Sequence, residues 1–380
     1  MKKRIFLRLF GFFVTLVMLS HTATLFCRAQ ISLSVSAKSA VLIDADSGKV
    51  LYEHAARTRM GMASTTKIMT ALTVTRIVSL TDTVSIPREA VGTEGSSVYL
   101  CEGEKLTVEQ LLYALLLSSA NDAAVALAVY CSGSVEAFAE QMNLYARELG
   151  LSDTNFVNPH GLYDEMHYTT AYDLALITRA ALEVECIRRI VSTYKITLPF
   201  EGVPDRRLAV NHNKLLKTYD GAIGVKTGFT KKTGRCLVSA AERDGLTLIA
   251  VTLSAPDDWR DHTAMLDHGF ENYERRIIAD VGELCVNMPV TGGNSDNVTL
   301  RNTAPLALTL PKAQLSPDVR VYSTYPFLYA PVREGERFAY AETAFEGEIC
   351  SSPMEIGETV ERRESKRGFF HSIINFFKKD

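Results

Sequence analysis

Two side chains near the start of the chain have the types and the spacing needed for nucleophilic catalysis. Ser64 and Lys67 stand three positions apart and lead into the apolar run at residues 68–72, so in a helix they would share one face. A serine hydroxyl is a weak nucleophile until a base removes its proton. A lysine can be that base only where burial or a neighbouring cation keeps its amine neutral. The spacing therefore predicts a serine nucleophile with a lysine as its base.

Two further motifs could complete a site around this pair. Ser119-Ala120-Asn121 supplies a second hydroxyl, which can relay protons, and an amide, which can hold a substrate carbonyl. Lys226-Thr227-Gly228 supplies a cation, a hydroxyl and a backbone without a side chain, along which an extended substrate can lie closely. We therefore predict that these motifs share one cleft with the serine and the lysine.

Other copies of these motifs occur in less suitable places. Ser192 and Lys195 repeat the first spacing just before a strand-like run, and about one such pair is expected by chance in a chain of this length. Ser295-Asp296-Asn297 follows the Lys-Thr-Gly motif and lies in a turn-forming cluster. Lys232-Thr233-Gly234 has the position of a hairpin tip, whereas the first copy follows Ile223-Gly224-Val225, as expected at the end of a strand. The prediction depends on the ordered set of three.

The same ordered set is typical of class A β-lactamases and penicillin-binding proteins. The chain resembles the low-molecular-mass penicillin-binding proteins, which are serine-type D-alanyl-D-alanine carboxypeptidases. The resemblance runs from about residue 36 to residue 273, and more loosely through the remaining chain. Three further stretches resemble that family: Asn158-Pro159-His160-Gly161-Leu162, residues 167–175 and residues 211–216.

The resemblance implies acyl transfer on a peptidoglycan stem peptide that ends in D-Ala-D-Ala. Ser64 would attack the carbonyl of the penultimate D-alanine, Lys67 would take the proton, and Ser119 would pass a proton to the departing D-alanine. Water would then hydrolyse the acyl-serine. β-Lactams would be trapped as stable acyl-serine adducts, because their strained amide resembles the same dipeptide.

The resemblance also implies the substrate-binding residues. Asn121 would hold the substrate amide, and Lys226 and Thr227 would bind the terminal carboxylate beside Gly228. Backbone N–H groups of the nucleophile and of Phe229 would stabilise the oxyanion, an effect worth a hundredfold or more in rate. The implied chemistry needs no cofactor. The sequence has no His-Glu-x-x-His motif, so we expect no metal site.

Three other functions stay open at this point. A β-lactamase would need a glutamate that activates the deacylating water, and the candidate Glu165 lies in a different sequence context. A DD-endopeptidase that cuts cross-links would use the same chemistry. A penicillin sensor would be acylated without turnover.

The N-terminus predicts export. Lys2-Lys3-Arg4 precede an apolar run at residues 10–19, and the small-residue exit at Cys27-Arg28-Ala29 suggests a signal peptide at residues 1–29. The run is short for a membrane span, although retention as an anchor is the alternative. Six of the seven cysteines would remain, without metal-ligand spacing, and are expected to pack as small apolar residues. An extracytoplasmic protein is expected.

Composition and length limit the remaining possibilities. The formal net charge of -3 over 380 residues argues against nucleic acid as a partner. The mature length exceeds what one core usually holds, so two domains are expected.

The expected elements predict an α/β fold of the α+β type for residues 30–277. A short β segment, a long helical middle and antiparallel strands follow one another, which fits an antiparallel sheet with a helical lobe and a site between them. Thr107-Val108-Glu109-Gln110 is a capping box that opens a helix through Leu117, and Asp244-Gly245 is typical of a hairpin turn. The expected hairpins cover residues 41–53 and 237–253, and further helices are expected at residues 121–130, 135–148, 171–181 and 262–273.

Residues 278–350 predict a small all-β domain of the sandwich type. Runs rich in Val, Leu and Tyr alternate there with Gly, Asn and Pro, without a cluster of titratable residues that could react. We expect a spacer or an interaction module. Its strands are expected at residues 284–290, 298–301, 306–310, 319–322, 330–332 and 337–341.

Residues 351–380 predict a charged linker and a C-terminal amphipathic helix. Lysines and arginines stand at both ends of the last segment, a composition typical of a helix that lies in a membrane interface. A helix packed on its own protein and a frayed terminus are the alternatives. In a helix, six apolar residues would gather on one side: Phe369, Phe370, Ile373, Ile374, Phe376 and Phe377.

Overall fold

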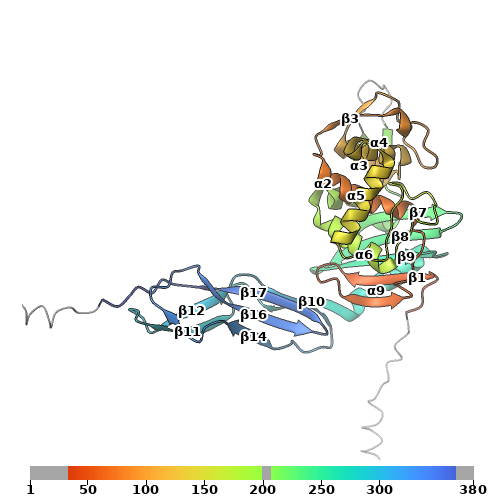
Figure 1. The fold of residues 1–380 in the computed structure, drawn as a ribbon. Coiled ribbons are helices and arrows are strands. Elements are labelled where there is room, and N and C mark those ends of the chain that lie inside the picture. Colours follow the sequence, from red (N-terminus) through yellow and green to blue (C-terminus); the bar gives the residue numbers. More distant parts are fainter. Residues whose placement is uncertain (1–32, 199–206, 365–380) are drawn as a thin grey trace, which may run out of the picture. The chain divides into compact units, whose positions relative to one another are not determined.

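The computed structural model describes residues 33–198 and 207–364 (Figure 1). The signal peptide expected at residues 1–29 and the amphipathic helix expected beyond residue 364 lie outside the described residues. We call residues 33–272 the N-terminal region and residues 273–364 the C-terminal region.

A five-stranded antiparallel sheet forms the centre of the N-terminal region. Its strands are β1 (Ser39–Asp44), β2 (Val50–His54), β7 (Ala222–Thr230), β8 (Gly234–Arg243) and β9 (Leu246–Leu253). They run in the order β2-β1-β9-β8-β7, so β7 is an edge strand. The two expected hairpins, β1–β2 and β8–β9, are confirmed. Asp244 and Gly245 have φ angles of 49° and 77°, as a two-residue turn of the primed type requires.

Side chains alternate along each strand and therefore point to both faces of the sheet, and both faces are covered. Val41 and Ile43 of β1 share a core with the helical lobe, whereas Leu42 lies against Gly269 of α9 (Asp258–Asn272). The central strand β9 is therefore buried along its whole length.

The helical lobe follows the sequence pattern closely. Thr107 and Gln110 form the expected capping box, and the helix expected at residues 135–148 has those bounds. The lobe consists of α2 (Lys67–Ile77), α3 (Val108–Leu117), α4 (Asn121–Ser132), α5 (Val135–Glu148), α6 (Ala171–Glu183) and α7 (Glu185–Ser192). Shorter elements accompany it: η1 (Ala63–Thr66), β3 (Thr83–Ser85), η2 (Arg88–Ala90), β4 (Lys105–Thr107), β5 (Lys195–Leu198), β6 (Arg207–Val210) and α8 (Leu215–Thr218).

Local details differ from expectation at the motifs. Ser64 lies in the 3₁₀ turn η1, and the α-helix begins only at Lys67. The Lys-Thr-Gly motif lies inside β7 rather than at a strand end, since Lys226 pairs with Val238 in the middle of the β7–β8 ladder. Both differences bring backbone groups of η1 and β7 within reach of each other, as described below.

The C-terminal region is all-β. A six-stranded sheet has the order β14-β16-β17-β12-β11-β15, and β10 (Tyr273–Ala279) pairs with β13 (Leu306–Pro311). Ala279 of β10 and Leu306 of β13 share one core with the larger sheet, as in a sandwich. The six strands are β11 (Cys285–Thr291), β12 (Asn297–Asn302), β14 (Val319–Ser323), β15 (Leu328–Tyr329), β16 (Arg337–Phe345) and β17 (Glu348–Ile356).

Two expectations about the C-terminal region were wrong. Residues 351–356 belong to β17 and not to a linker, because Ser352, Met354 and Ile356 alternate into the core while the intervening residues are more exposed. The strand expected at residues 330–332 is replaced by β15, two residues earlier. Backbone hydrogen bonding continues to Arg363, whose N–H group donates to the Gly292 carbonyl oxygen.

Within the described ranges, the structure contains no single helix that is both long and apolar enough to cross a bilayer; α4 and α5 meet the length and composition criteria only as a pair bent by 82°.

Candidate active site

Ser64 and Lys67 face each other in a buried setting. The turn η1 places the two residues about one turn apart, and Lys67 Nζ lies 3.1 Å from Ser64 Oγ. The Lys67 amine also donates hydrogen bonds to Asn121 Oδ1 at 2.7 Å and to the His160 carbonyl oxygen at 2.6 Å. Lys67 is fully buried.

The surroundings of Lys67 favour its neutral form. Burial lowers the pKa of the Lys67 amine well below its ordinary value, and the nearby Lys226 ammonium lowers it further, although Asp122 acts in the opposite direction. A neutral amine has two hydrogens and one lone pair. In that form, Asn121 Oδ1 and the His160 carbonyl oxygen can accept the two hydrogens, which leaves the lone pair for the Ser64 hydroxyl 3.1 Å away. This is the arrangement that a general base requires.

A buried histidine holds the turn that carries Ser64. Thr66 Oγ1 donates to the Ala63 carbonyl oxygen at 2.8 Å and lies 2.7 Å from His167 Nε2. His167 Nδ1 accepts from the Val157 N–H group, so Nε2 carries the hydrogen and donates to Thr66. Burial lowers the pKa of His167 to about 4, which keeps this donor neutral.

Gly161 allows a second segment to approach the same turn. It has a φ angle of 89°, and a Cβ atom at this position would lie 1.9 Å from the Ala63 carbonyl oxygen. No other residue type fits without moving η1. The neighbouring His160 presents its backbone carbonyl to Lys67 through this close approach.

The second motif lies at the junction between α3 and α4. Ser119 has a positive φ angle of 59° and is 4% exposed, and Asn121 begins α4. The Asn121 amide nitrogen donates to the Glu94 carbonyl oxygen at 2.5 Å, while its Oδ1 accepts from Lys67. Asp122 holds the same loop, since its carboxylate accepts from Ser97 Oγ at 2.6 Å. Asn121 therefore connects the lysine to the loop at Glu94.

The third motif brings the edge of the sheet to the serine. A Cβ atom on Gly228 would lie 2.9 Å from the Ser64 backbone nitrogen, so β7 passes directly beside η1. Lys226 is 1% exposed, and its Nζ donates to the Thr227 carbonyl oxygen at 3.0 Å. Burial lowers the pKa of Lys226 to about 7. The Phe229 side chain is 64% exposed at the rim.

The other copies of the motifs lie elsewhere, as interpreted from the sequence. Ser192 ends α7 and donates to the Arg188 and Ile223 carbonyl oxygens. Lys232 stands at the tip of the β7–β8 hairpin, with its Nζ 5.9 Å from the centre of the Tyr163 ring. Ser295 forms a turn in the C-terminal region, where its Oγ donates to the Asn297 carbonyl oxygen.

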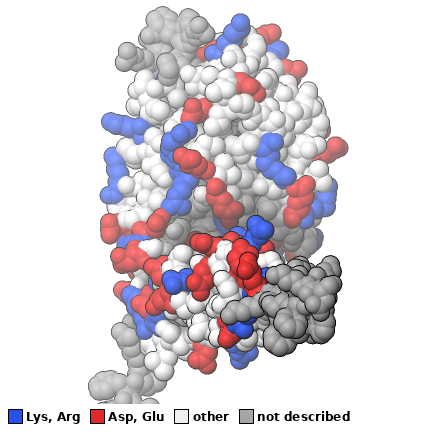
Figure 2. Space-filling view, turned by 90° about the vertical axis from the view of Figure 1, so that its left-hand side faces the viewer, with Lys and Arg blue, Asp and Glu red and all other residues white. Residues whose placement is uncertain are grey.

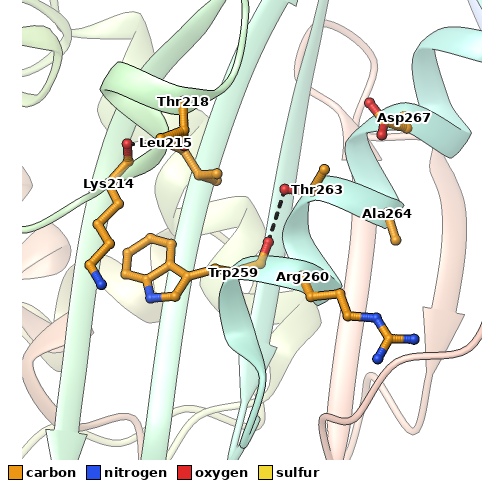
Figure 3. A pocket seen from close by; sticks show the side chains of 8 residues that line it. All are labelled: Lys214, Leu215, Thr218, Trp259, Arg260, Thr263, Ala264 and Asp267. Carbon is orange, nitrogen blue, oxygen red and sulfur yellow. Dashed lines mark hydrogen bonds between the residues drawn. The ribbon is translucent and has the colours of Figure 1, made fainter.

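A separate groove of about 490 Å³ lies between α8 and α9 (Figure 3). Trp259 and Lys214 line it from the two sides, with the Lys214 amine 5.7 Å from the indole ring centre. None of the residues of the three motifs lines this groove. The site is therefore defined by the meeting of η1, α4 and β7 and not by this groove.

Sequence reasoning missed the residues that hold the site in place. The Glu94 carbonyl oxygen accepts from Asn121, and Gly161 packs against η1. The buried Asp122 carboxylate holds the loop at Ser97, and His167 supports η1. The stretches around residues 160 and 167 had been noted only as a resemblance. Asp122 could have been suspected, because it directly follows Asn121 in an otherwise apolar helix.

Comparison with known proteins agrees with this geometry. A family model described as D-alanyl-D-alanine carboxypeptidase matches residues 26–257. The D-alanyl-D-alanine carboxypeptidase DacF of Bacillus subtilis (strain 168) is 34% identical over 357 residues, covering 91% of this chain and 90% of the relative. DacC of Escherichia coli (strain K12), with the same descriptive name, is 32% identical over 90% of this chain and 88% of its own length.

Solved structures extend the similarity to the whole fold. Penicillin-binding protein 5 from Haemophilus influenzae has a TM-score of 0.70 at 29% identity, covering 87% of this chain and 98% of that chain. A peptidoglycan synthesis regulatory factor, PBP3, from Streptococcus pneumoniae has a TM-score of 0.76 at 25% identity, over 86% of this chain and 100% of that one. The chain belongs to the D-alanyl-D-alanine carboxypeptidase family of serine peptidases.

Proposed function

We propose that the protein removes the terminal D-alanine from peptidoglycan stem peptides that end in D-Ala-D-Ala, through an acyl enzyme on Ser64. The observation that supports this most directly is the fully buried Lys67 amine, whose Nζ lies 3.1 Å from Ser64 Oγ and whose pKa is lowered by burial. Family membership supplies the substrate class.

Acylation begins when Ser64 Oγ attacks the carbonyl carbon of the penultimate D-alanine. Lys67 Nζ accepts the hydroxyl proton, and the new C–O bond forms as the carbonyl becomes an oxyanion. The backbone N–H groups of Ser64 and Phe229 stabilise that charge. When the C–N bond breaks, the nitrogen of the leaving D-alanine takes the proton from Lys67 through the Ser119 hydroxyl.

Deacylation repeats the same steps with water. Lys67, neutral again, removes a proton from the water that attacks the acyl-serine carbonyl, and Ser64 leaves with that proton. The shortened peptide departs with a new carboxylate. Lys67 therefore serves both half-reactions, which requires a pKa close to the working pH.

Substrate orientation is assigned to the edge of β7. The terminal carboxylate binds Lys226 and the Thr227 hydroxyl, and the backbone at Gly228 allows the extended peptide to lie beside the strand. The free N–H of Asn121 holds the carbonyl of the preceding residue. A strained β-lactam would acylate Ser64 in the same position and would leave slowly.

The sequence context places this activity outside the cytoplasm. The N-terminal segment has the composition of a signal peptide, and the C-terminal segment has that of a helix lying in a membrane interface. We propose that the protein is exported and is held on the outer face of the cytoplasmic membrane by residues 365–380.

The proposal is tested by incubating the purified protein with a peptide that ends in D-Ala-D-Ala and weighing the product. Loss of one alanine residue is expected for the native chain, and Ser64→Ala should abolish both this loss and labelling by a fluorescent penicillin. Ser192→Ala is the matched control, because Ser192 has the same spacing to a lysine and should be dispensable. Labelling that persists in Ser64→Ala would move the nucleophile elsewhere.

The same assay separates the related activities. The Glu165 side chain is exposed, which disfavours a β-lactamase that needs a glutamate to hold water in a closed site. Rapid hydrolysis of penicillin by the purified protein would instead favour a β-lactamase. Cleavage of a cross-linked dimer without release of free alanine would indicate an endopeptidase, and stoichiometric labelling without any product would indicate a sensor.

A further inference from the structure

Three exposed aromatic residues occupy alternate positions of one short segment in the C-terminal region. Tyr325, Phe327 and Tyr329 are 56%, 39% and 70% exposed, and we call them the ring ridge. The rings of Phe327 and Tyr329 meet edge to face, with centroids 5.2 Å apart. Large exposed rings in a group are unusual on a surface that meets only water.

The ring ridge lies beside the point where the described chain ends. Leu328 and Tyr329 of β15 pair with Val290 and Thr291 of β11. The next residues on both strands contact the C-terminal segment: Arg362 Nε donates to the Ala330 carbonyl oxygen at 3.1 Å, and the Arg363 N–H group donates to the Gly292 carbonyl oxygen at 2.9 Å. The last described residues are thus fixed to the same margin of the sheet as the rings.

The segment that follows is the one with a membrane-binding composition. Phe369 is its first aromatic residue and stands six positions after Arg363. A fully extended chain of six residues spans about 20 Å at most. If residues 365–380 lie in a membrane interface, the surface of that membrane is held within this distance of Arg363, and the ring ridge is close to it.

Charge alone does not explain an approach to the membrane at this margin. On the face drawn in Figure 2, acidic and basic side chains are interspersed. Glu334, Glu336 and Glu358 are exposed near this end of the sheet, and the Asp296 carboxylate is paired with Arg363 at 3.0 Å. These carboxylates would resist a flat approach to an anionic surface, so the contact is confined to the rings and Arg362.

We propose that the ring ridge enters the headgroup region of the membrane as a second, non-ionic contact beside the C-terminal anchor. The proposal rests on the proposed anchoring by residues 365–380. Tyrosine and phenylalanine side chains have apolar rings suited to the acyl boundary, and the tyrosine hydroxyls can remain in the headgroup layer. The contact would fix the orientation of the C-terminal region on the lipid surface, because two separate points of attachment restrict rotation more than one.

The single tryptophan of the chain makes a direct test possible. In a Trp259→Phe background, Phe327→Trp places the only fluorophore of this kind on the ring ridge. Leu315→Trp in the same background is the matched control, because Leu315 is 83% exposed and precedes β14 at the opposite end of the sheet. That end is fixed by the pairing of Val319 with Thr343, next to the β16–β17 turn, whereas Phe327 follows the other end of β14.

Both full-length proteins are mixed with phosphatidylcholine–phosphatidylglycerol vesicles that carry brominated acyl chains. Bound protein is measured by sedimentation, and quenching by bromine reports contact with the bilayer. We expect the emission from position 327 to be quenched at least twofold more than that from position 315. Equal quenching at positions 327 and 315, in protein that sediments with the vesicles, would refute the membrane contact of the ring ridge but not the anchor. Failure of both proteins to sediment would overturn the anchor and the ring ridge together.

A second measurement distinguishes the rings from ionic attraction. The double substitution Phe327→Ser and Tyr329→Ser should weaken vesicle binding about tenfold at high salt, where ionic contacts are screened. Leu315→Ser should leave binding unchanged, and all variants should keep the native rate of penicillin labelling. If isolated peptidoglycan, and not lipid, changes the emission from position 327, the ring ridge is a glycan-binding surface and the membrane contact is refuted.

Discussion

The two regions of the molecule bury polar groups in different ways. In the N-terminal region, Lys67, Lys226 and Asp122 are almost inaccessible to water, and each has specific partners. In the described part of the C-terminal region, the buried polar residues are neutral and few: Asn302, Thr309, Thr343 and Ser352. Burying a group that can carry charge is unfavourable unless its surroundings are arranged for it. The contrast indicates where the fold sacrifices stability for chemistry.

The largest expected effect is the loss of the buried base. Lys67→Ala should lower the rate of acylation by a fluorescent penicillin at least about a thousandfold, since the Ser64 hydroxyl would lose its proton acceptor. Lys67→Arg should be equally inactive, because a guanidinium stays protonated. Stopped-flow labelling measures the rate, and Lys232→Ala is the control with an exposed lysine. Fast acylation in Lys67→Arg would show that a neutral amine is not needed.

A smaller effect is expected from the glycine behind the serine. Gly161→Ala should lower kcat/KM about a hundredfold, because the new Cβ would push the Ala63 carbonyl oxygen and displace Ser64. Gly133→Ala is the matched control: its φ angle is 80°, similar to that of Gly161, but no atom lies within 4 Å of an added Cβ. Both variants place an alanine at a positive φ angle and share that backbone strain. The difference between their kcat/KM values therefore measures the effect of the collision with the Ala63 carbonyl oxygen. Equal losses of activity would assign the effect to strain.

The two regions also differ in how much the sequence could predict. Periodicity and turn residues were sufficient for the β8–β9 hairpin and for α5, because local chemistry decides them. The three motifs predicted side chains that the structure brings together where η1, α4 and β7 meet. His160 follows Lys67 by 93 residues in the sequence, so no local pattern encodes the contact between the His160 carbonyl oxygen and the Lys67 amine. The linker expected from residue 351 included the second half of β17, although alternation already placed Met354 and Ile356 on one face.

The pH profile of kcat/KM should have two limbs, one for each buried lysine, and kcat/KM should change about tenfold per pH unit on each limb. Lys67 must be neutral to act as a base, and its pKa is lowered by burial, so kcat/KM should fall on the acidic side as that amine becomes protonated. Lys226 must be protonated to bind a carboxylate, and burial lowers its pKa to about 7, so kcat/KM should also fall on the alkaline side. The profile is measured with the D-Ala-D-Ala peptide from pH 5 to 10.

Lys226→Arg isolates the alkaline limb. An arginine stays charged over this range, so the fall in kcat/KM above pH 7 should disappear even if the absolute rate is lower. Lys232→Arg should leave the profile unchanged, because that residue lies at the hairpin tip. An alkaline limb that survives in Lys226→Arg would have to come from another group.

The smallest expected effect is on stability in acid, and it should be confined to the N-terminal region. Burial lowers the pKa of His167 to about 4 and that of His262 to about 3, whereas the unfolded chain binds protons near pH 6.5. Below pH 6.5 the unfolded state takes up protons that the folded state refuses, so the free energy of unfolding should fall by about 1 kcal/mol per pH unit for each histidine. The loss should stop near the folded pKa values.

The C-terminal region should not follow this trend, because residues 278–363 contain no histidine. The contribution of Glu348 in β17 to the free energy of unfolding changes in the opposite direction. Burial raises the pKa of Glu348, so the folded state binds its proton at a higher pH than the unfolded state and gains stability as the pH falls. Hydrogen exchange at pH 6.5 and pH 5, corrected for intrinsic rates, should show protection falling in α9 and β9 but not in β16 and β17. His262→Gln should remove part of the fall, while His54→Gln, at an exposed position, should not. A uniform loss of protection across both regions would mean that they unfold as one unit. The difference between the two regions would then not extend to their stability.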